Sequence, residues 1–198
     1  NTATVGHDLE VGRESTGVGA LEVGRQTVGM TSPELYSGSS LSVTGNALIG
    51  NQGQGTLSMY SGTMSIGGRL GIGAGSGGSG SVTLGAATTI ADAAQLNISG
   101  NLEVGAMGQG QLTILGPSQV TVGGQLLLGV GGTGDVSVAG GSITLGNQAT
   151  IGGNGSGSWQ QSAGSATFSG SVGLGTAAAG TGSLSLSGGT LSALSLNL

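Results

Sequence analysis

The sequence predicts an all-β protein folded as a single parallel β-helix, or β-solenoid, and three observations support this fold class. Glycine supplies 47 of the 198 residues, well above its average share. Short segments alternate between apolar and small polar residues, as strands with one buried face do. An apolar residue followed by glycine recurs with a regular period. Each coil would therefore hold about 23–24 residues and three short strands, and the chain would form six to eight coils.

The period is measured between the glycines of the apolar–glycine pairs. In sequence order, the successive spacings are 12, 26, 23, 32, 24, 23 and 23. The spacing of 32 equals one period plus about nine further positions, which predicts an insertion within residues 85–99, and the spacing of 12 is irregular. The pairs lie at positions 11–12, 23–24, 49–50, 72–73, 104–105, 128–129, 151–152 and 174–175.

Residues 100–122 illustrate the plan of one coil. Apolar and polar residues alternate at 102–104, 112–114 and 120–122, and turns containing glycine separate these segments. A period of two places the apolar members on one face of a strand. The same plan predicts further strands at residues 57–59, 64–66, 126–128, 136–138, 143–145, 172–174, 184–186 and 191–193.

Three short strands in a fixed period are typical of a coil rather than of a hairpin ladder. Equivalent strands of successive coils would pair in parallel at the strand spacing of ~4.8 Å. Leu, Val and Ile would stack in inward columns, because one repeat alone cannot bury its apolar residues. Ser and Thr suit the outward columns, because like charges on neighbouring strands repel each other.

Charge is concentrated near the amino terminus. Residues 1–39 hold seven of the eleven charged residues, so we expect irregular, charge-richer coils or an arm there and the regular solenoid at 40–198. Lys and Arg total three, which disfavours nucleic acid as a partner. Cysteine is absent, which removes disulfide scaffolds and cysteine zinc sites. No apolar run is long enough to predict a transmembrane segment.

Few residues have the pattern of a catalytic or metal site. Glu10 and Glu22 occupy identical Leu-Glu-Val-Gly-Arg strings, and stacking would bring them to ~5 Å, as in a retaining glycosidase. Arg13 and Arg25 repeat beside them, which favours a compensated surface ladder. His7 is the only histidine, and no serine has a His/Asp partner set. We therefore expect no enzyme activity, no cofactor and no metal.

Two further segments allow a structural and a functional interpretation. The Gly-x-Gly-x-x-Gly segment at 73–78 lacks the following helix of a dinucleotide site and is interpreted as a turn. Trp159 and Phe168 replace aliphatic residues in one coil, and Gln161 falls at an inward position. We interpret this coil as a locally irregular core, in which Gln161 finds partners or sits in a bulge, rather than as an aromatic sugar-binding platform.

Two outward columns of hydroxyl side chains form the most distinctive predicted surface. Alternation places residues two apart on the same outward face, and the period stacks them coil over coil. The result would be a flat Ser/Thr face, which an ice-binding solenoid would also present. The predicted ladder comprises Thr63, Ser65, Thr121, Ser142, Thr144, Ser165, Thr167, Thr190 and Ser192.

The repeat unit has a familiar form. The strings GNLEVGAMGQGQLTILGPSQVTV, GGQLLLGVGGTGDVSVAGGSITL and SGSVGLGTAAAGTGSLSLSGGTLS resemble the passenger repeats of bacterial type V secretion (autotransporter) proteins. They are also similar to the repeats of exported proteins that carry a PEP-type sorting signal. The resemblance covers about residues 40–198. It implies an exported β-solenoid, extracellular or on the bacterial cell surface, that is usually non-catalytic.

The terminal segments suggest how such a solenoid would act. Open strand ends template further pairing unless they are capped, so the chain is either a slice of a longer passenger or a subunit that stacks head to tail. The leading hypothesis is an exported structural protein that self-associates into extracellular fibres or a surface or biofilm matrix. The alternatives are an adhesin that binds a cell surface or glycan, and an ice-binding protein. The candidate end-contact residues are Thr2, Thr4, Val5, Leu191, Leu194, Leu196 and Leu198.

Overall fold

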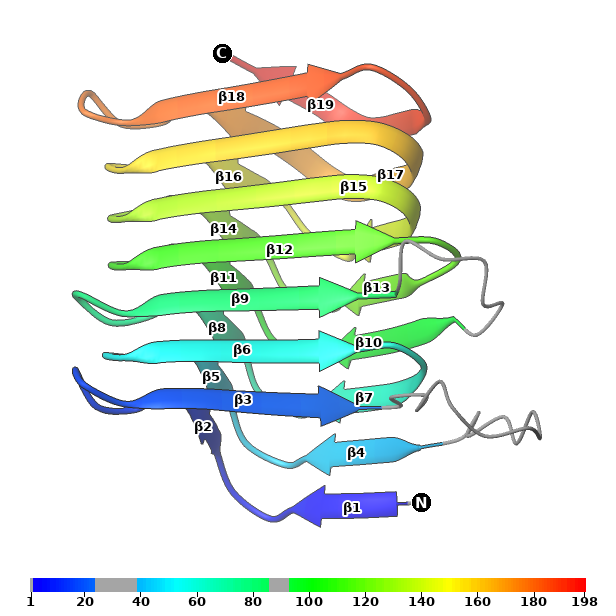
Figure 1. Ribbon diagram of the computed structural model, residues 1–198. Helices are drawn as coiled ribbons and strands as arrows, with labels where there is room; N and C mark the ends of the chain where they lie inside the picture. The colour runs from blue at the N-terminus through cyan, green and yellow to red at the C-terminus, as the bar shows by residue number, and fades with distance from the viewer. Residues whose placement is uncertain (1, 24–38, 86–92) are drawn as a thin grey trace.

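The computed structural model describes residues 2–23, 39–85 and 93–198. Within these ranges the chain forms strands, turns and bends, and no helix. All the strands belong to one parallel sheet that winds around an axis (Figure 1). The predicted all-β parallel β-helix is therefore confirmed.

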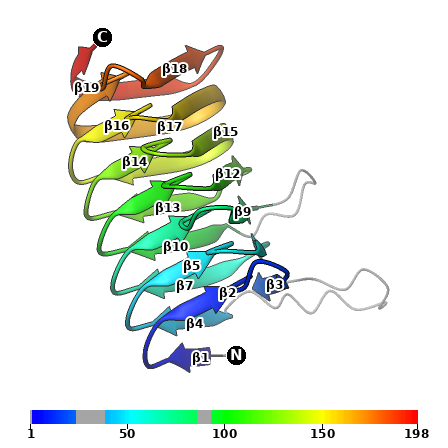
Figure 2. The same ribbon diagram turned by 90° about the vertical axis from the view of Figure 1, so that its left-hand side faces the viewer.

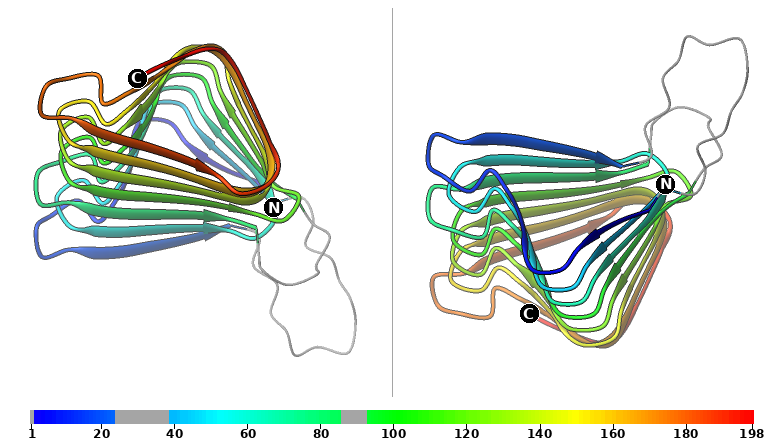
Figure 3. Two further views of the ribbon diagram at one scale, coloured as in Figure 1. Left: turned by 90° about the horizontal axis from the view of Figure 1, so that it is seen from above. Right: turned by 90° about the horizontal axis from the view of Figure 1, so that it is seen from below.

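The strands form three faces, which we name A, B and C in the order in which the chain visits them (Figure 3). Face A consists of β1 (Thr2–Val5), β4 (Ser40–Val43), β7 (Gly62–Ile66), β10 (Ala94–Ile98), β13 (Gln119–Val122) and parts of β15 (Thr133–Leu145), β17 (Ser156–Leu174) and β19 (Thr190–Asn197). Face B consists of β2 (Leu9–Val11), β5 (Ala47–Ile49), β8 (Leu70–Ile72), β11 (Leu102–Val104), β14 (Leu126–Leu128), β16 (Ala149–Ile151) and the ends of β17 and β19. Face C consists of β3 (Val18–Val23), β6 (Gln54–Met59), β9 (Ser79–Leu84), β12 (Gln109–Leu115), the starts of β15 and β17, and β18 (Thr181–Leu186).

Strand register gives the coil length directly. Thr63 lies opposite Ser40, and Ser142 lies opposite Gln119, so both pairs have a sequence offset of 23. The described residues make seven three-sided coils and an eighth that has faces A and B, within the predicted six to eight (Figure 2). Between β7 and β10 the offset rises to 32, since Thr63 pairs with Gln95. Part of the predicted insertion at 85–99, residues 86–92, lies outside the described residues.

The irregular spacing of 12 has a different cause from the other spacings. Val11 ends a face B strand, whereas Val23 ends the face C strand of the same coil. Val11 and Val23 thus mark the ends of two strands of one coil rather than two successive coils. Thr2 pairs with Ser40 at a sequence offset of 38, so the step from the first coil to the second is longer than the regular one. Residues 2–23 accordingly form a complete first coil.

Inward columns of aliphatic side chains fill the space between the faces. Ile72, Val104 and Leu128, for example, lie on successive coils and are fully buried. Burying one such side chain stabilises the fold by about 1.5–3 kcal/mol. Each coil gains this energy from the coil above and the coil below, so the fold depends on stacking.

Glycine shapes the corner between faces B and C. Gly129 has φ +64° there, and a Cβ on it would lie 1.9 Å from the backbone oxygen of Ser156 in the next coil. Further along the same coil Gly134 takes an inward position, where a Cβ would lie 2.1 Å from the backbone oxygen of Val104. Faces B and C therefore converge into a wedge too narrow for side chains.

Asparagine supports the corner between faces A and B. The Asn46 side-chain oxygen accepts the backbone N–H of Arg69 at 3.0 Å, one coil further on. The Asn101 side-chain oxygen accepts the backbone N–H of Gln125 at 3.0 Å in the same way. These bonds tie successive coils together at a position that the strand ladders do not reach.

Candidate functional surfaces

Face A presents two outward columns of polar side chains that run the length of the described solenoid. All nine residues of the predicted ladder lie in these columns, so the structure brings them together on one face. The first column is Thr2, Ser40, Thr63, Gln95, Gln119, Ser142, Ser165 and Thr190. The second column is Thr4, Ser42, Ser65, Asn97, Thr121, Thr144, Thr167 and Ser192.

The face A columns are half-buried to exposed and contain no charged residue. Thirteen of the sixteen side chains carry a hydroxyl, and Gln95, Gln119 and Asn97 carry amides. The Ser40 hydroxyl donates to the Thr2 hydroxyl oxygen at 3.1 Å and so links the second coil to the first. Sequence reasoning missed Gln95 and Asn97, because the longer offset before β10 moves them out of the 23-residue period.

The strands at the two ends of the described solenoid have a partner on one side only. β1, β2 and β3 pair with the second coil, while β18 and β19 pair with β17. The candidate residues Thr2, Thr4 and Val5 lie in β1. Leu191, Leu194 and Leu196 lie in β19, and Leu198 directly follows it.

Apolar side chains are exposed at these ends. Leu194 is 80% exposed, Leu196 53% and Leu198 95% at the end formed by β19. At the opposite end the inward-facing Val5, Leu9 and Leu21 are only partly buried. Leu191 is partly buried against the core. Each end therefore combines an unpaired strand edge with apolar surface, the two features that promote association between chains.

The expected stacking of Glu10 on Glu22 is wrong. Glu10 lies in face B opposite Leu48, whereas Glu22 lies in face C opposite Ser58. The two identical strings lie on different faces, because strands of face B and of face C can both end at an apolar residue that glycine follows in the sequence. The Glu10 carboxylate instead pairs with Arg13, three residues along, at 3.1 Å between Oε2 and Nε. Arg25 lies outside the described residues.

A second ion pair joins two charges that are far apart in sequence. Arg69 donates to the Glu103 carboxylate across neighbouring coils on the edge of face B. The Glu103 side chain is 13% exposed and that of Arg69 is 41% exposed. The pair escaped sequence reasoning because the longer offset before β10 brings these residues together. Its partial exposure fits a structural role in holding two coils together.

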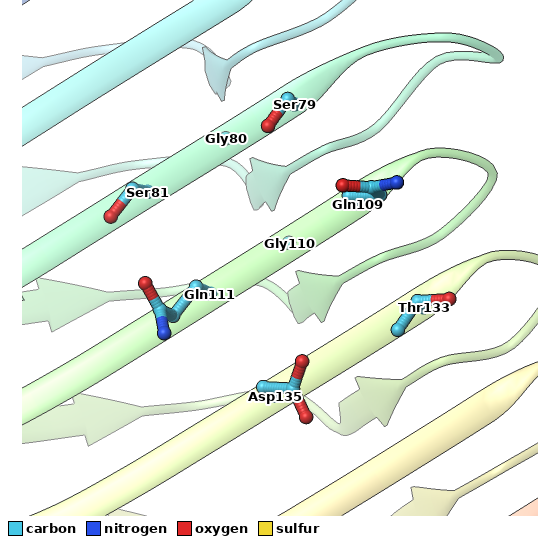
Figure 4. A pocket seen from close by; sticks show the side chains of 8 residues that line it. All are labelled: Ser79, Gly80, Ser81, Gln109, Gly110, Gln111, Thr133 and Asp135. Carbon is cyan, nitrogen blue, oxygen red and sulfur yellow. The ribbon is translucent and has the colours of Figure 1, made fainter.

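Face C is hollowed into a shallow groove of about 420 Å³ across the third, fourth and fifth coils (Figure 4). Gln109 and Gln111 project from β12, with the shorter Ser79 and Ser81 on β9 beside them. Among the described residues that line the groove, Asp135 is the one titratable side chain. Across residues 2–23, 39–85 and 93–198, no group of three or more His, Cys, Asp or Glu side chains could hold a metal ion.

The two ambiguous segments have structural roles. Residues 73–78 form a B–C corner, in which Gly73 and Gly77 have positive φ. Trp159 and Phe168 are buried and meet edge to face, with ring centroids 5.3 Å apart at 62°. Gln161 is buried and donates from Nε2 to the backbone oxygens of Gly164 at 3.2 Å and Thr190 at 2.9 Å. Trp159 lies on face C of the sixth coil and Phe168 on face A of the seventh, so the two aromatic rings fill an irregular part of the core where these coils meet.

Comparison with family models, curated proteins and solved structures finds no match to the chain. In the part of the chain that the structure describes, no helix has the length and apolar character to span a membrane.

Proposed function

We propose that the protein is an exported, non-catalytic structural β-solenoid that self-associates end to end into extracellular fibres or a surface matrix. The observation that carries this proposal is the pair of ends of the described solenoid, each with strands paired on one side only and with apolar side chains that are exposed or only partly buried. The resemblance of the repeats to exported passenger proteins supports the location.

The two ends have matching column patterns. In β19, Thr190–Ala193 continue face A and Ser195–Asn197 continue face B. A second copy would set β1 on the first of these segments and β2 on the second, so that Leu196 continues the inward column toward Leu9. The contact is heterologous, because one end meets the other, and repetition therefore gives a filament rather than a closed dimer.

The junction uses two of the three faces. The last face C strand, β18, belongs to the seventh coil, whereas β19 has already begun the eighth. The β3 strand of a second copy would therefore lie two strand spacings from β18, ~10 Å away. Faces A and B carry the main-chain pairing, and side chains near β18 contribute less.

Negative-stain electron microscopy of the purified 198-residue chain at increasing concentration tests this proposal. We expect unbranched filaments of constant width. Leu196→Lys should shorten or abolish them, because a charge on an edge strand opposes pairing. Met107→Lys provides the matched control, since Met107 is 65% exposed but lies in the fourth coil. Discrete short rods at every concentration would contradict the proposal.

A further inference from the structure

Face A differs from the other two faces in its outward chemistry. Its sixteen column positions hold thirteen hydroxyls and three amides, with no charge and no large apolar side chain. Face B carries Glu10 and Glu103 outward, and face C carries Glu22 and Asp135. A second molecule can therefore approach face A without meeting a charge on the described strands.

We propose that face A is a lateral interaction surface that packs against face A of a second copy of this chain. Each hydroxyl can donate and accept, so identical columns can satisfy each other across the contact. Ser and Thr are short and lose little rotamer freedom on burial, which lowers the cost of ordering them. Stacked sheets with flat, short-side-chain faces interdigitate in this manner, and Asn and Gln ladders strengthen such contacts.

A contact with twofold symmetry between two copies suits face A, because its two columns carry the same kinds of side chain. In an isologous contact the same patch serves both copies, so it must be complementary to itself. An uncharged surface meets this requirement, because no like charges are brought together. Faces B and C would each bury charged side chains in the same arrangement, Glu10 and Glu103 with their arginine partners on face B and Glu22 and Asp135 on face C.

The dimensions of face A set the strength of this contact. Four residues per rung span about 13 Å, and eight rungs span about 34 Å, so each copy contributes roughly 440 Å². The total is below the ~1,200–2,000 Å² of a stable interface, and the contact between two single copies is therefore weak. If the chains also join end to end, which rests on the proposed function, many such contacts would act together and bundle the filaments.

Sedimentation equilibrium in a Leu196→Lys background tests the lateral contact separately from filament formation. We expect a monomer of 18.5 kDa at low concentration and an average mass that rises toward twice that value only at the highest concentrations, as a weak contact requires. Adding Thr121→Lys and Thr144→Lys, on face A of adjacent coils, should hold the mass at the monomer value. The matched control adds Thr133→Lys and Ser158→Lys, on face C, and should associate like the background.

Two further readouts make the outcome decisive. Circular dichroism must show the same β-sheet signal and melting temperature for both lysine pairs, so that lost association is not lost folding. Because no charges meet, association should change little between about 0.15 M and 1 M salt. A background protein that stays monomeric, or equal loss from both lysine pairs, would overturn the proposal. Monomeric behaviour would indicate that face A binds another ordered partner, such as a glycan or ice surface. It would not contradict filaments seen with the unmodified chain.

Discussion

The B–C and C–A corners belong to the same coils, but the number of residues in them varies to a different extent from coil to coil. In all seven three-sided coils the B–C corner contains four or six residues. At the C–A corner, β15 and β17 run through without a break, whereas sixteen residues separate β3 from β4. Both extra segments of the repeat fall at the C–A corner, after β3 and after β9.

The difference is in accepted length, because both corners touch the neighbouring coils. At the B–C corner the chain lies against the backbone of the next coil, and a Cβ on Gly50, Gly73 or Gly105 would lie within 2.1 Å of a carbonyl oxygen. At the C–A corner Gly141 and Gly164 also lie against the previous coil, and a Cβ on them would lie 2.2 and 2.3 Å from a backbone oxygen. Both corners therefore pack on neighbouring coils, and the C–A corner differs in accepting added length, as loops on one face of a repeat fold do.

The largest expected effect comes from filling the B–C wedge. Gly129→Ala should destabilise the protein by more than about 4 kcal/mol, a size typical of severe steric conflict. Gly77→Ala isolates the backbone strain, because Gly77 also has positive φ, +78°, but nothing lies within 4 Å of its Cβ position. It should cost about 1–2 kcal/mol. Urea unfolding of both variants measures the difference, and equal losses would contradict the packing explanation.

Inserted length tests the two corners directly. A nine-residue Gly/Ser insertion between Gly116 and Pro117, both exposed at a C–A corner, should cost about 1 kcal/mol in loop closure. The same insertion between Gly131 and Gly132 displaces glycines packed on the previous coil, and should cost about 3 kcal/mol. Thermal unfolding of both variants compares them, and a larger loss at the C–A corner would reverse the comparison.

The smallest expected loss of stability comes from the A–B corner, the third corner of each coil. Asn101→Ala removes the acceptor for the backbone N–H of Gln125 and should cost about 1 kcal/mol. Asn147→Ala is the control, because its side chain accepts from the adjacent Gln148 in an exposed position. Its loss should be within ~0.5 kcal/mol of zero. Chemical denaturation resolves the two, and a larger loss from Asn147→Ala would show that inter-coil bonds do not matter here.

The periodic features of this fold follow from sequence, because the strand alternation and the coil repeat are local patterns. They correctly gave the strands, the inward columns and the hydroxyl ladder of face A. The pairing of Arg69 with Glu103 and the positions of Gln95 and Asn97 depend on the longer offset before β10. The placement of Glu10 and Glu22 on different faces depends on which corner each apolar–glycine pair marks. Sequence similarity between two segments does not reveal such three-dimensional assignments.

Electron cryo-microscopy of the filaments proposed for the 198-residue chain would measure the axial rise per copy, which end-to-end strand pairing fixes. A second copy that continues faces A and B begins at the ninth strand level, so each copy should add eight strand spacings. We expect a rise of about 38 Å and an uninterrupted ~4.8 Å repeat across the junction on faces A and B. Filaments with a clearly different rise, or with no strand pairing at the junction, would contradict it.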